Sequence, residues 1–318
     1  MAYEYLTMLD IAKMNAADDM AVGLIEENLN AAPEIKVLPA RMIDGTNFTT
    51  LVRTAYPSTG FRSVNEGVEP KKSTYVNKTF ETFYYDGQME VDNAAATADK
   101  QGAAHALALE ADGHGRAFLL TAGKQVWYGN AAGGSGDAKG FPGAIQVVDS
   151  GLVVDATGTT ASTGSSVYAV VASDKFFELI LGNQTVLTTG EWRKQTVTRS
   201  SKEMTAWKNS LEGWIGAAFY SKYAVGRIKN LTADSGKGLT DSLLADLISA
   251  FPVGVKPTHL FMSRRSRKQL QKSRTVTLFG QATTKPGGNQ ATIAPIPTEY
   301  DDIPIIATDS VIDTESIA

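Results

Sequence analysis

Residues 99–129 carry the longest helical pattern of the chain, with the sequence DKQGAAHALALEADGHGRAFLLTAGKQVWYG. Asp99 can cap the first turn and Gly129 can close the last one. Apolar side chains recur at steps of three, four or seven, and we expect one face to hold Ala104, Leu107, Ala108, Ala111, Phe118, Leu119, Ala122 and Val126. The pattern predicts a helix of about 28 residues, roughly 40 Å long at ~1.5 Å per residue.

Glycines inside this pattern indicate that the helix needs support along its length. Gly102, Gly113, Gly115 and Gly123 each cost about 0.5–1 kcal/mol relative to alanine in a helix interior. Propensity alone would not hold the helix together. It is therefore either a central core helix or a spine across which neighbouring pieces, including pieces of other subunits, are laid.

Two segments before the helix have no core of their own. Residues 3–31 predict a helical arm with a thin apolar stripe, broken by Pro33 and Pro39. Residues 48–56 and 74–85 are rich in β-branched and aromatic side chains, and they predict the two strands of a long hairpin with a polar tip. A two-stranded ribbon is at best marginally stable in water. We therefore expect both segments to dock on another surface.

The middle of the chain is predicted to be rich in strands. A turn at Asp86-Gly87 is expected to precede the helix, and the glycine-rich residues 128–143 form its exit. Strand patterns then follow at 145–148, 152–154, 167–171, 178–181 and 224–228. The polar residues 188–210 interrupt these strands and indicate an insertion or a loop-borne subdomain.

The last third contains two helices with recognisable starts. Thr240 is expected to cap a helix that ends at Pro252, and Ser263 to cap a basic helix from Arg264 to Arg274. The remaining elements are a short buried strand, a loop rich in Gly, Thr and Gln, and a terminal strand, at 259–262, 280–292 and 303–308.

Composition excludes several classes of protein. The formal net charge is −4, from 34 acidic and 30 basic residues, so there is no electrostatic footprint for autonomous binding of nucleic acid or a membrane surface. The chain has no Cys, and hence no disulfide, thiolate metal site or Cys nucleophile. It shows neither a signal-peptide pattern nor a run of 18 apolar residues. We expect a soluble protein that is made inside the cell.

No motif predicts a catalytic, cofactor or metal site. The glycine-rich segments miss the GxGxxG and GxxxxGK[ST] spacings, because Lys139 replaces a glycine and Gly238 replaces Ser or Thr. The histidines His105, His114 and His259 are far apart, and none belongs to an HExxH motif. We expect no catalytic residue, no cofactor and no metal, and hence no enzyme. The basic helix is more typical of a solvated face or of contact with acidic partners than of phosphate binding.

Several segments resemble tailed-bacteriophage major capsid proteins. Residues 64–73, VNEGVEPKKS, and the following Gln88-Met89-Glu90-Val91 are similar to their extended-loop region, in which EG, then P, then S precede the spine helix. The other similar segments are the glycine-rich exit and residues 261–264 and 300–309. Their order is specific: arm, long hairpin, spine helix, glycine-rich exit, mixed α/β region and terminal strand.

The resemblance implies an α+β protein with the Hong Kong 97-type capsid fold, podovirus-like in its elaborated axial region. The implied parts are an N-terminal arm (1–43), an extended hairpin loop (44–86), a peripheral domain with the spine helix (87–143 and 293–318), and an axial domain (144–292) with a β-rich insertion (about 166–232). The chain has no long N-terminal prodomain, which implies a separate scaffolding protein.

The function implied is that of a major capsid protein, which self-assembles as hexamers and pentamers into an icosahedral head shell around double-stranded phage DNA. Expected partners are further copies of the chain, a scaffolding protein, a portal and possible decoration protein, with no membrane and no sequence-specific DNA contact. The protein is expected in the virion, after assembly in the host bacterial cytoplasm. Predicted contacts between subunits involve Glu66, Glu69, Lys71, Lys72, Arg264, Arg265 and Arg267. The alternatives are an encapsulin-like shell around protein cargo and an unrelated soluble α+β enzyme.

Overall fold

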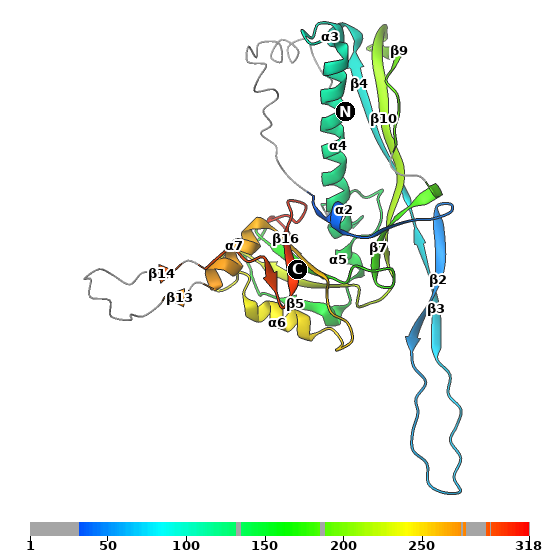
Figure 1. Cartoon of the computed structure of the whole chain (residues 1–318), viewed down its shortest axis with the longest axis vertical. Helices are drawn as coiled ribbons and strands as arrows, with labels where there is room; N and C mark the ends of the chain where they lie inside the picture. The colour runs from blue at the N-terminus through cyan, green and yellow to red at the C-terminus, as the bar shows by residue number, and fades with distance from the viewer. Residues whose placement is uncertain are drawn as a thin grey trace, which may run out of the picture.

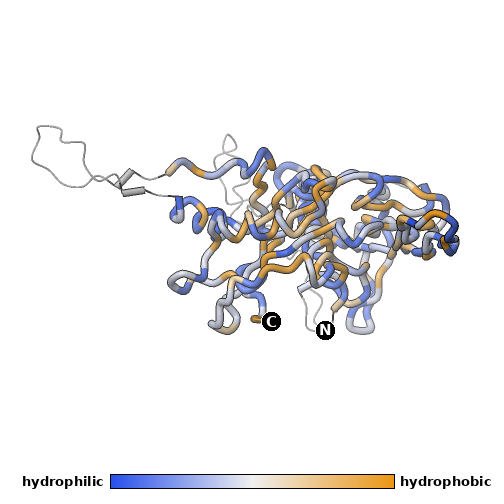
Figure 2. The backbone as a smooth tube through the Cα atoms, turned by 90° about the horizontal axis from the view of Figure 1, so that it is seen from below, coloured by the Kyte–Doolittle hydropathy of each residue, from blue (hydrophilic) through white to orange (hydrophobic). Residues whose placement is uncertain are grey.

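A computed structural model describes residues 32–131, 135–184, 188–274, 276–277, 291–292 and 294–317. A long helix and a ribbon of strands form one end, a body of sheet and short helices lies at the base of the helix, and a hairpin projects the opposite way (Figure 1). Apolar stretches gather in the middle of the molecule (Figure 2). The arm predicted at 3–31 lies outside the described residues.

The predicted long helix is confirmed as α4, Ala103–Tyr128, with 26 residues. Gly129 ends it with φ +60°, a conformation in which glycine has no steric penalty. The predicted start is wrong: Asp99 does not cap α4, whose N-cap is Gly102. Asp99 instead accepts a hydrogen bond from the backbone of Gln101 at 3.0 Å and pairs with His105 at 2.8 Å. A separate short helix, α3 (Asn93–Thr97), precedes this turn.

The expected apolar face of α4 is buried only in part. Leu107, Phe118, Ala122 and Val126 are buried, as predicted, whereas Ala104 and Ala108 are exposed. At Gly113 and Gly115 an added Cβ would meet no atom within 4 Å. The last turns therefore sink into the body, and the middle of the helix stands clear of it.

One sheet contains six strands and runs from the body to the far end of α4. Its order is β1-β7-β10-β4, and β8 and β9 also pair with β10. The strands are β1 (Ala40–Met42), β4 (Phe83–Asp92), β7 (Phe177–Leu181), β8 (Thr188–Thr189), β9 (Arg193–Arg199) and β10 (Lys202–Phe219). Residues 188–210 do not interrupt the strands as predicted, since they form β8, β9 and the start of β10. That this segment is an insertion stays a prediction. The domain boundary proposed at residue 144 stays a prediction, although β10 and β4 join its two sides in one sheet.

The hairpin consists of β2 (Asn47–Ala55) and β3 (Thr74–Glu81), paired antiparallel. The predicted continuation of its second strand to residue 85 is wrong. The backbone of Thr82 donates to Thr46 at 2.8 Å and closes the hairpin, after which β4 pairs with β10 instead. The turn predicted at Asp86-Gly87 is also wrong, because both residues lie inside the unbroken β4–β10 ladder.

The second sheet has the order β15-β16-β12-β6-β11-β5. Its strands are β5 (Val153–Asp155), β6 (Ser165–Val170), β11 (Val225–Leu231), β12 (His259–Met262), β15 (Glu299–Tyr300) and β16 (Ile303–Ala307). The strand predicted at 145–148 is a short helix instead, α5 (Ala144–Val147), whose first turn is closed because the Gln146 side chain accepts from the Gly143 backbone at 2.9 Å.

The two capped helices are confirmed as α6 (Asp241–Ser249) and α7 (Arg264–Ser273), with Thr240 and Ser263 as N-caps. The loop predicted at 280–292 falls largely outside the described residues. Its last two residues form β14 (Ala291–Thr292), which pairs with β13 (Val276–Thr277).

The C-terminal segment is tied to the end of α4 by a buried polar network. Tyr128 donates to Glu315 at 2.6 Å, and Arg227 on β11 forms an ion pair with the same carboxylate at 3.0 Å. Ser166 on β6 donates to the second oxygen of Glu315 at 2.6 Å. Burial, followed by the nearby Tyr168 and Glu315, raises the pKa of the Tyr128 hydroxyl above its ordinary value. The helix, the second sheet and the chain end are thereby held in one arrangement.

Candidate assembly interfaces

The root of the hairpin is held on the body by aromatic packing. The ring centroids of Phe48 and Phe80, which face each other across β2 and β3, lie 5.6 Å apart, and Phe80 meets Tyr220 edge-on at 5.0 Å. Ile43 and Ile180 complete this small core. Aromatic pairs of this geometry add about 0.5–1.5 kcal/mol beyond burial. The hairpin therefore leaves the body in a defined direction.

Polar contacts reinforce the same root. Arg41 on β1 donates to the Tyr220 hydroxyl at 2.8 Å and forms an ion pair with the buried Glu178 at 3.1 Å. Tyr220 in turn donates to Glu178. Burial and the neighbouring Glu178 raise the pKa of Tyr220. Lys78 on β3 donates to the Tyr220 carbonyl at 3.1 Å. Tyr220 therefore binds both β1, which precedes the hairpin, and β3, its second strand.

Sequence reasoning missed this anchor. Arg41, Glu178 and Tyr220 lie far apart in the sequence, and none belongs to a motif. The one available signal was the placement of Phe48 and Phe80 at matching positions of the two predicted strands.

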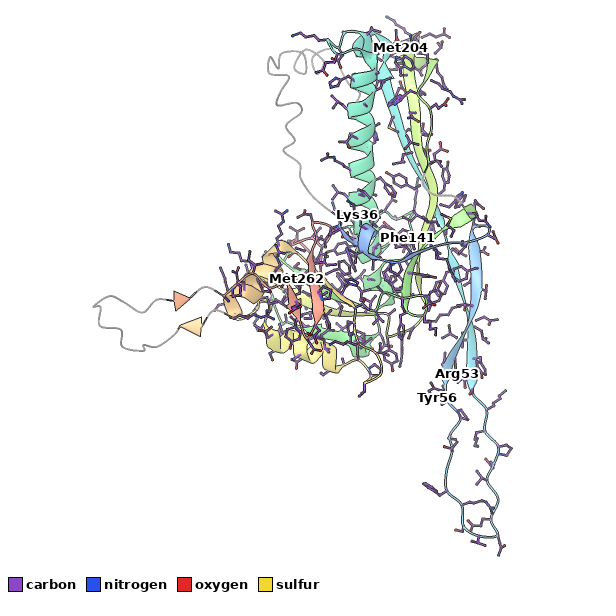
Figure 3. All side chains as sticks on the ribbon, in the orientation of Figure 1. Lys36, Arg53, Tyr56, Phe141, Met204 and Met262 are labelled. Carbon is purple, nitrogen blue, oxygen red and sulfur yellow. The ribbon has the colours of Figure 1, made fainter. Side chains whose placement is uncertain are left out.

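Beyond its root, the hairpin exposes an unusual amount of apolar side chain. Seven of the thirteen exposed large apolar residues in the described part of the chain lie between positions 51 and 76. They are Leu51, Tyr56, Phe61, Val64, Val68, Tyr75 and Val76. Figure 3 shows Arg53 and Tyr56 on this projection, at a distance from the body. Clustered exposed apolar side chains mark a surface that a partner covers.

The four predicted contact residues of the hairpin all lie at its tip, residues 56–73, and all are exposed. The structure brings two of them together, since Lys71 pairs with Glu69 at 2.8 Å. Glu66 and Lys72 are exposed beside this pair. An exposed ion pair contributes only about 0–1 kcal/mol, so the tip charges do little for the subunit itself.

The predicted contact residues on α7 are engaged to different degrees within the chain. Arg264 is largely exposed and lies 3.7 Å from Asp309. Arg265 is half-buried and donates to the carbonyls of Thr163, Leu231 and Asp313 at 2.7, 3.2 and 3.1 Å. Arg267 is also half-buried. Arg265 therefore fastens loops of its own subunit, which the sequence did not indicate.

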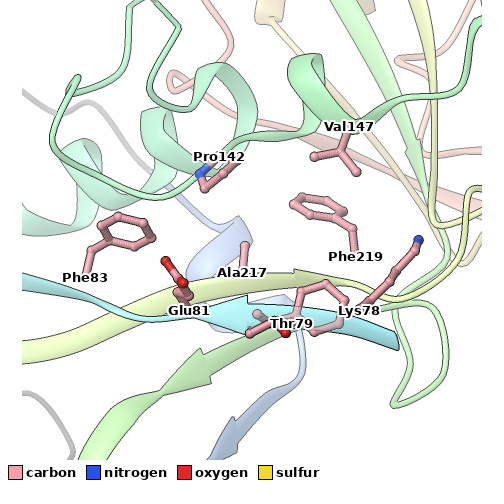
Figure 4. A pocket seen from close by; sticks show the side chains of 9 residues that line it. Lys78, Thr79, Glu81, Phe83, Pro142, Val147, Ala217 and Phe219 are labelled. Carbon is pink, nitrogen blue, oxygen red and sulfur yellow. The ribbon is translucent and has the colours of Figure 1, made fainter. Parts of the chain in front are cut away.

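An apolar groove lies where the hairpin root meets the body. It has a volume of about 390 Å³ and is lined by Phe83, Pro142, Val147, Ala217 and Phe219, with Lys78 and Glu81 on the strand that borders it. Figure 4 shows the two phenylalanine rings facing this space from opposite ends. The groove and the hairpin form a concave corner of the subunit.

Chemistry-bearing side chains do not converge within the described ranges. No group of three or more His, Asp or Glu side chains there could hold a metal ion. No helix of the described residues is both long and apolar enough to span a membrane. Tyr128 and Tyr168, whose pKa values burial raises, belong to the buried polar network around Glu315.

Comparisons with known proteins agree with this geometry. The family model for the major capsid protein GP7 matches residues 23–318, whereas no curated protein sequence is similar to the chain. A chain in the structure of bacteriophage Epsilon15 is similar over 99% of this chain and 98% of its own, with a TM-score of 0.72 and 16% identity. A chain from the native GTA particle capsid has a TM-score of 0.44 at 10% identity, over 67% of this chain and 95% of its own. A chain from Mycobacterium phage Cain has a TM-score of 0.46 at 10% identity, over 71% of this chain and 98% of its own.

The match to Epsilon15 shows the fold, and with it the expected Hong Kong 97-type architecture is confirmed. The family match extends over nearly the whole described chain, including the hairpin, α4 and both sheets. The chain therefore belongs to the major capsid protein GP7 family and forms the head shell of a phage.

Proposed function

We propose that copies of this chain assemble as hexamers and pentamers into an icosahedral shell that encloses double-stranded DNA. The observation that carries the proposal is the hairpin, which is rigidly mounted at its root and uncovered beyond it. Phe61 and Val64 have exposed fractions of 109% and 88%, so the subunit itself gives them no cover. A neighbouring copy that covers them removes this apolar surface from water.

The tip charges and the cations of α7 then act between subunits. Glu66, Glu69, Lys71 and Lys72 would meet complementary charges of a neighbour, as would Arg264 and the flanking Arg265 and Arg267. Each exposed pair contributes little, but a closed symmetric shell repeats the same contact many times. Arg264 has the most accessible of these guanidinium groups that the structure records.

The remaining partners follow from the head-shell role. A separate scaffolding protein would guide assembly in the host bacterial cytoplasm, a portal would occupy one vertex, and a decoration protein is a possible addition. The net charge of −4 fits a wall that encloses DNA without gripping it. No enzymatic role is proposed. No observation favours the alternative of an encapsulin-like shell around protein cargo.

The test is charge reversal at the tip, with Lys71→Glu and Lys72→Glu combined. We expect the unassembled subunit to keep its stability within about ±0.5 kcal/mol, because both side chains are on the surface. Shell yield should fall, and most at low salt, where repulsion between like charges is least screened. The measurements are thermal unfolding of the subunit and electron microscopy of shells across a salt series.

The matched control is Lys71→Arg with Lys72→Arg, which keeps both charges and should assemble normally. Normal shells from the reversed variant at every salt concentration would show that the tip is only a solvated turn. A wild-type protein that stays monomeric over a wide concentration range, by light scattering, would contradict the assembly proposal itself.

A further inference from the structure

The first described residues are fastened beneath the end of α4 by a buried carboxyl group. Glu34 on α2 (Glu34–Val37) has an exposed fraction of 0%, and Thr308 donates to its Oε2 at 2.7 Å. A Cβ added at Gly123 of α4 would lie 3.0 Å from the Cβ of Ala32 and would collide with Oε1 of Glu34. The glycine therefore lets the incoming segment pass against the helix backbone.

The other carboxyl oxygen lies among uncharged polar groups. Oε1 of Glu34, Oγ of Ser310 and Nε1 of Trp127 are buried, and within the described residues none has a hydrogen-bond partner at normal geometry. Ser310 on the C-terminal segment and Trp127 on α4 still lie close enough to influence the carboxyl group. Every group of the described chain that acts on it is uncharged: Thr308, Ser310, Trp127 and its own backbone.

This setting favours the protonated carboxyl. An ionised carboxylate is costly to bury without a cation, and no charged side chain is among the groups of the described residues that act on Glu34. Burial accordingly raises the pKa of Glu34 above its ordinary value, and the neighbouring hydroxyls offset only part of this rise.

We propose that Glu34 is a proton-dependent latch that holds residues 32–38 against α4 and residues 308–310. With the carboxyl protonated, the latch is closed. On ionisation it loosens and releases the root of the N-terminal segment from the body. The inference concerns the single subunit and does not depend on the proposed contacts between subunits.

The direction of the pH effect follows from the direction of the pKa shift. The closed latch binds a proton up to a higher pH than the open one, in which Glu34 meets water and titrates near its ordinary value. The latch is therefore firmest below that ordinary pKa. The latch weakens as the pH rises through the raised pKa of Glu34. Above that pKa, the protection of the latched amides from hydrogen exchange stays low.

Hydrogen exchange of the unassembled full chain tests this latch. Protection of the amides of Lys36, Val37 and Leu38, which are hydrogen-bonded within this segment, is corrected for the intrinsic exchange rate and measured from about pH 4.5 to about pH 8.5. We expect it to fall about tenfold for each unit by which burial raises the pKa. Glu34→Gln, which is neutral at every pH, should remove this fall. Ser310→Ala removes a group that lowers the pKa and should move the fall to higher pH.

The control is Glu299→Gln on β15, an exposed carboxyl that should leave the wild-type profile intact. Protection that stays constant over the pH range in the wild type would overturn the proposal, as would an equal fall in Glu34→Gln. If Glu34→Gln does not fold, Ser310→Ala decides the question, because an unshifted profile in that variant contradicts the latch.

Discussion

Replacing Gly123 by alanine separates the two roles that a glycine can have in a long helix. In an open helix position Gly→Ala gains about 0.5–1 kcal/mol from propensity. At Gly123, however, the new Cβ would overlap Oε1 of Glu34 and Oγ of Ser310 and would lie 3.0 Å from the Cβ of Ala32. All three residues are buried, so they cannot simply swing into solvent.

Overpacking of a buried site typically costs about 1–3 kcal/mol. Subtracting the propensity gain leaves an expected net loss of roughly 0–2.5 kcal/mol for Gly123→Ala. Gly113→Ala and Gly115→Ala are matched controls in the same helix, since nothing lies within 4 Å of either added Cβ. Each control should instead gain about 0.5–1 kcal/mol.

The assay is urea unfolding of the unassembled subunit, with all variants at one protein concentration. Comparison of the midpoints at equal slope gives the change in the free energy of unfolding. A Gly123→Ala variant as stable as Gly113→Ala would refute the close approach of the N-terminal root to α4. It would also remove the steric basis of the Glu34 latch.

Two further substitutions test the buried network and the hairpin root. Arg227→Met should lower the free energy of unfolding of the subunit by about 3–5 kcal/mol, because it leaves the carboxylate of Glu315 buried without its cation. Denaturant unfolding measures this loss, and a value below about 1 kcal/mol would contradict the ion pair. Phe80→Ala should lower the free energy of unfolding by about 2 kcal/mol, since the half-buried ring packs on Phe48 and Tyr220. Amide exchange in β2 and β3 should also rise more than in β6. Unchanged exchange in the hairpin would show that the aromatic root does not orient it.

Local patterns in the sequence predicted those elements whose residues depend mainly on their neighbours in the chain. The helical period within 99–129 and the closing Gly129 predicted α4, although not its first residue, and the caps Thr240 and Ser263 predicted α6 and α7. The alternation of β-branched and aromatic residues gave the hairpin strands. The hairpin tip was also predicted as polar and charged, although not as apolar as Phe61 and Val64 make it.

Errors arose where a distant strand decided the outcome. Asp86-Gly87 is a strong turn signal, yet both residues pair with Leu211 and Glu212 in the middle of a long ladder. The polar residues of β9 lack a strand-like alternation of buried and exposed positions, because their ladder is stabilised by pairing with β10 and not by burial. Residues 145–148 resemble a strand by composition, but the Gln146 side chain closes a helical turn.

The sequence by itself determined the order of the elements, the length of α4 and the presence of a hairpin too long to support itself, because each depends on residues close together in the chain. Tertiary structure alone decided the anchor of Arg41, Glu178 and Tyr220, and the burial of Glu34 beneath Gly123. The partners in these contacts are separated by more than 40 residues, and no local period records which of them meet. The charge state and hydrogen bonds of these side chains depend on burial and on the neighbours buried with them. Both exist only once the chain is folded.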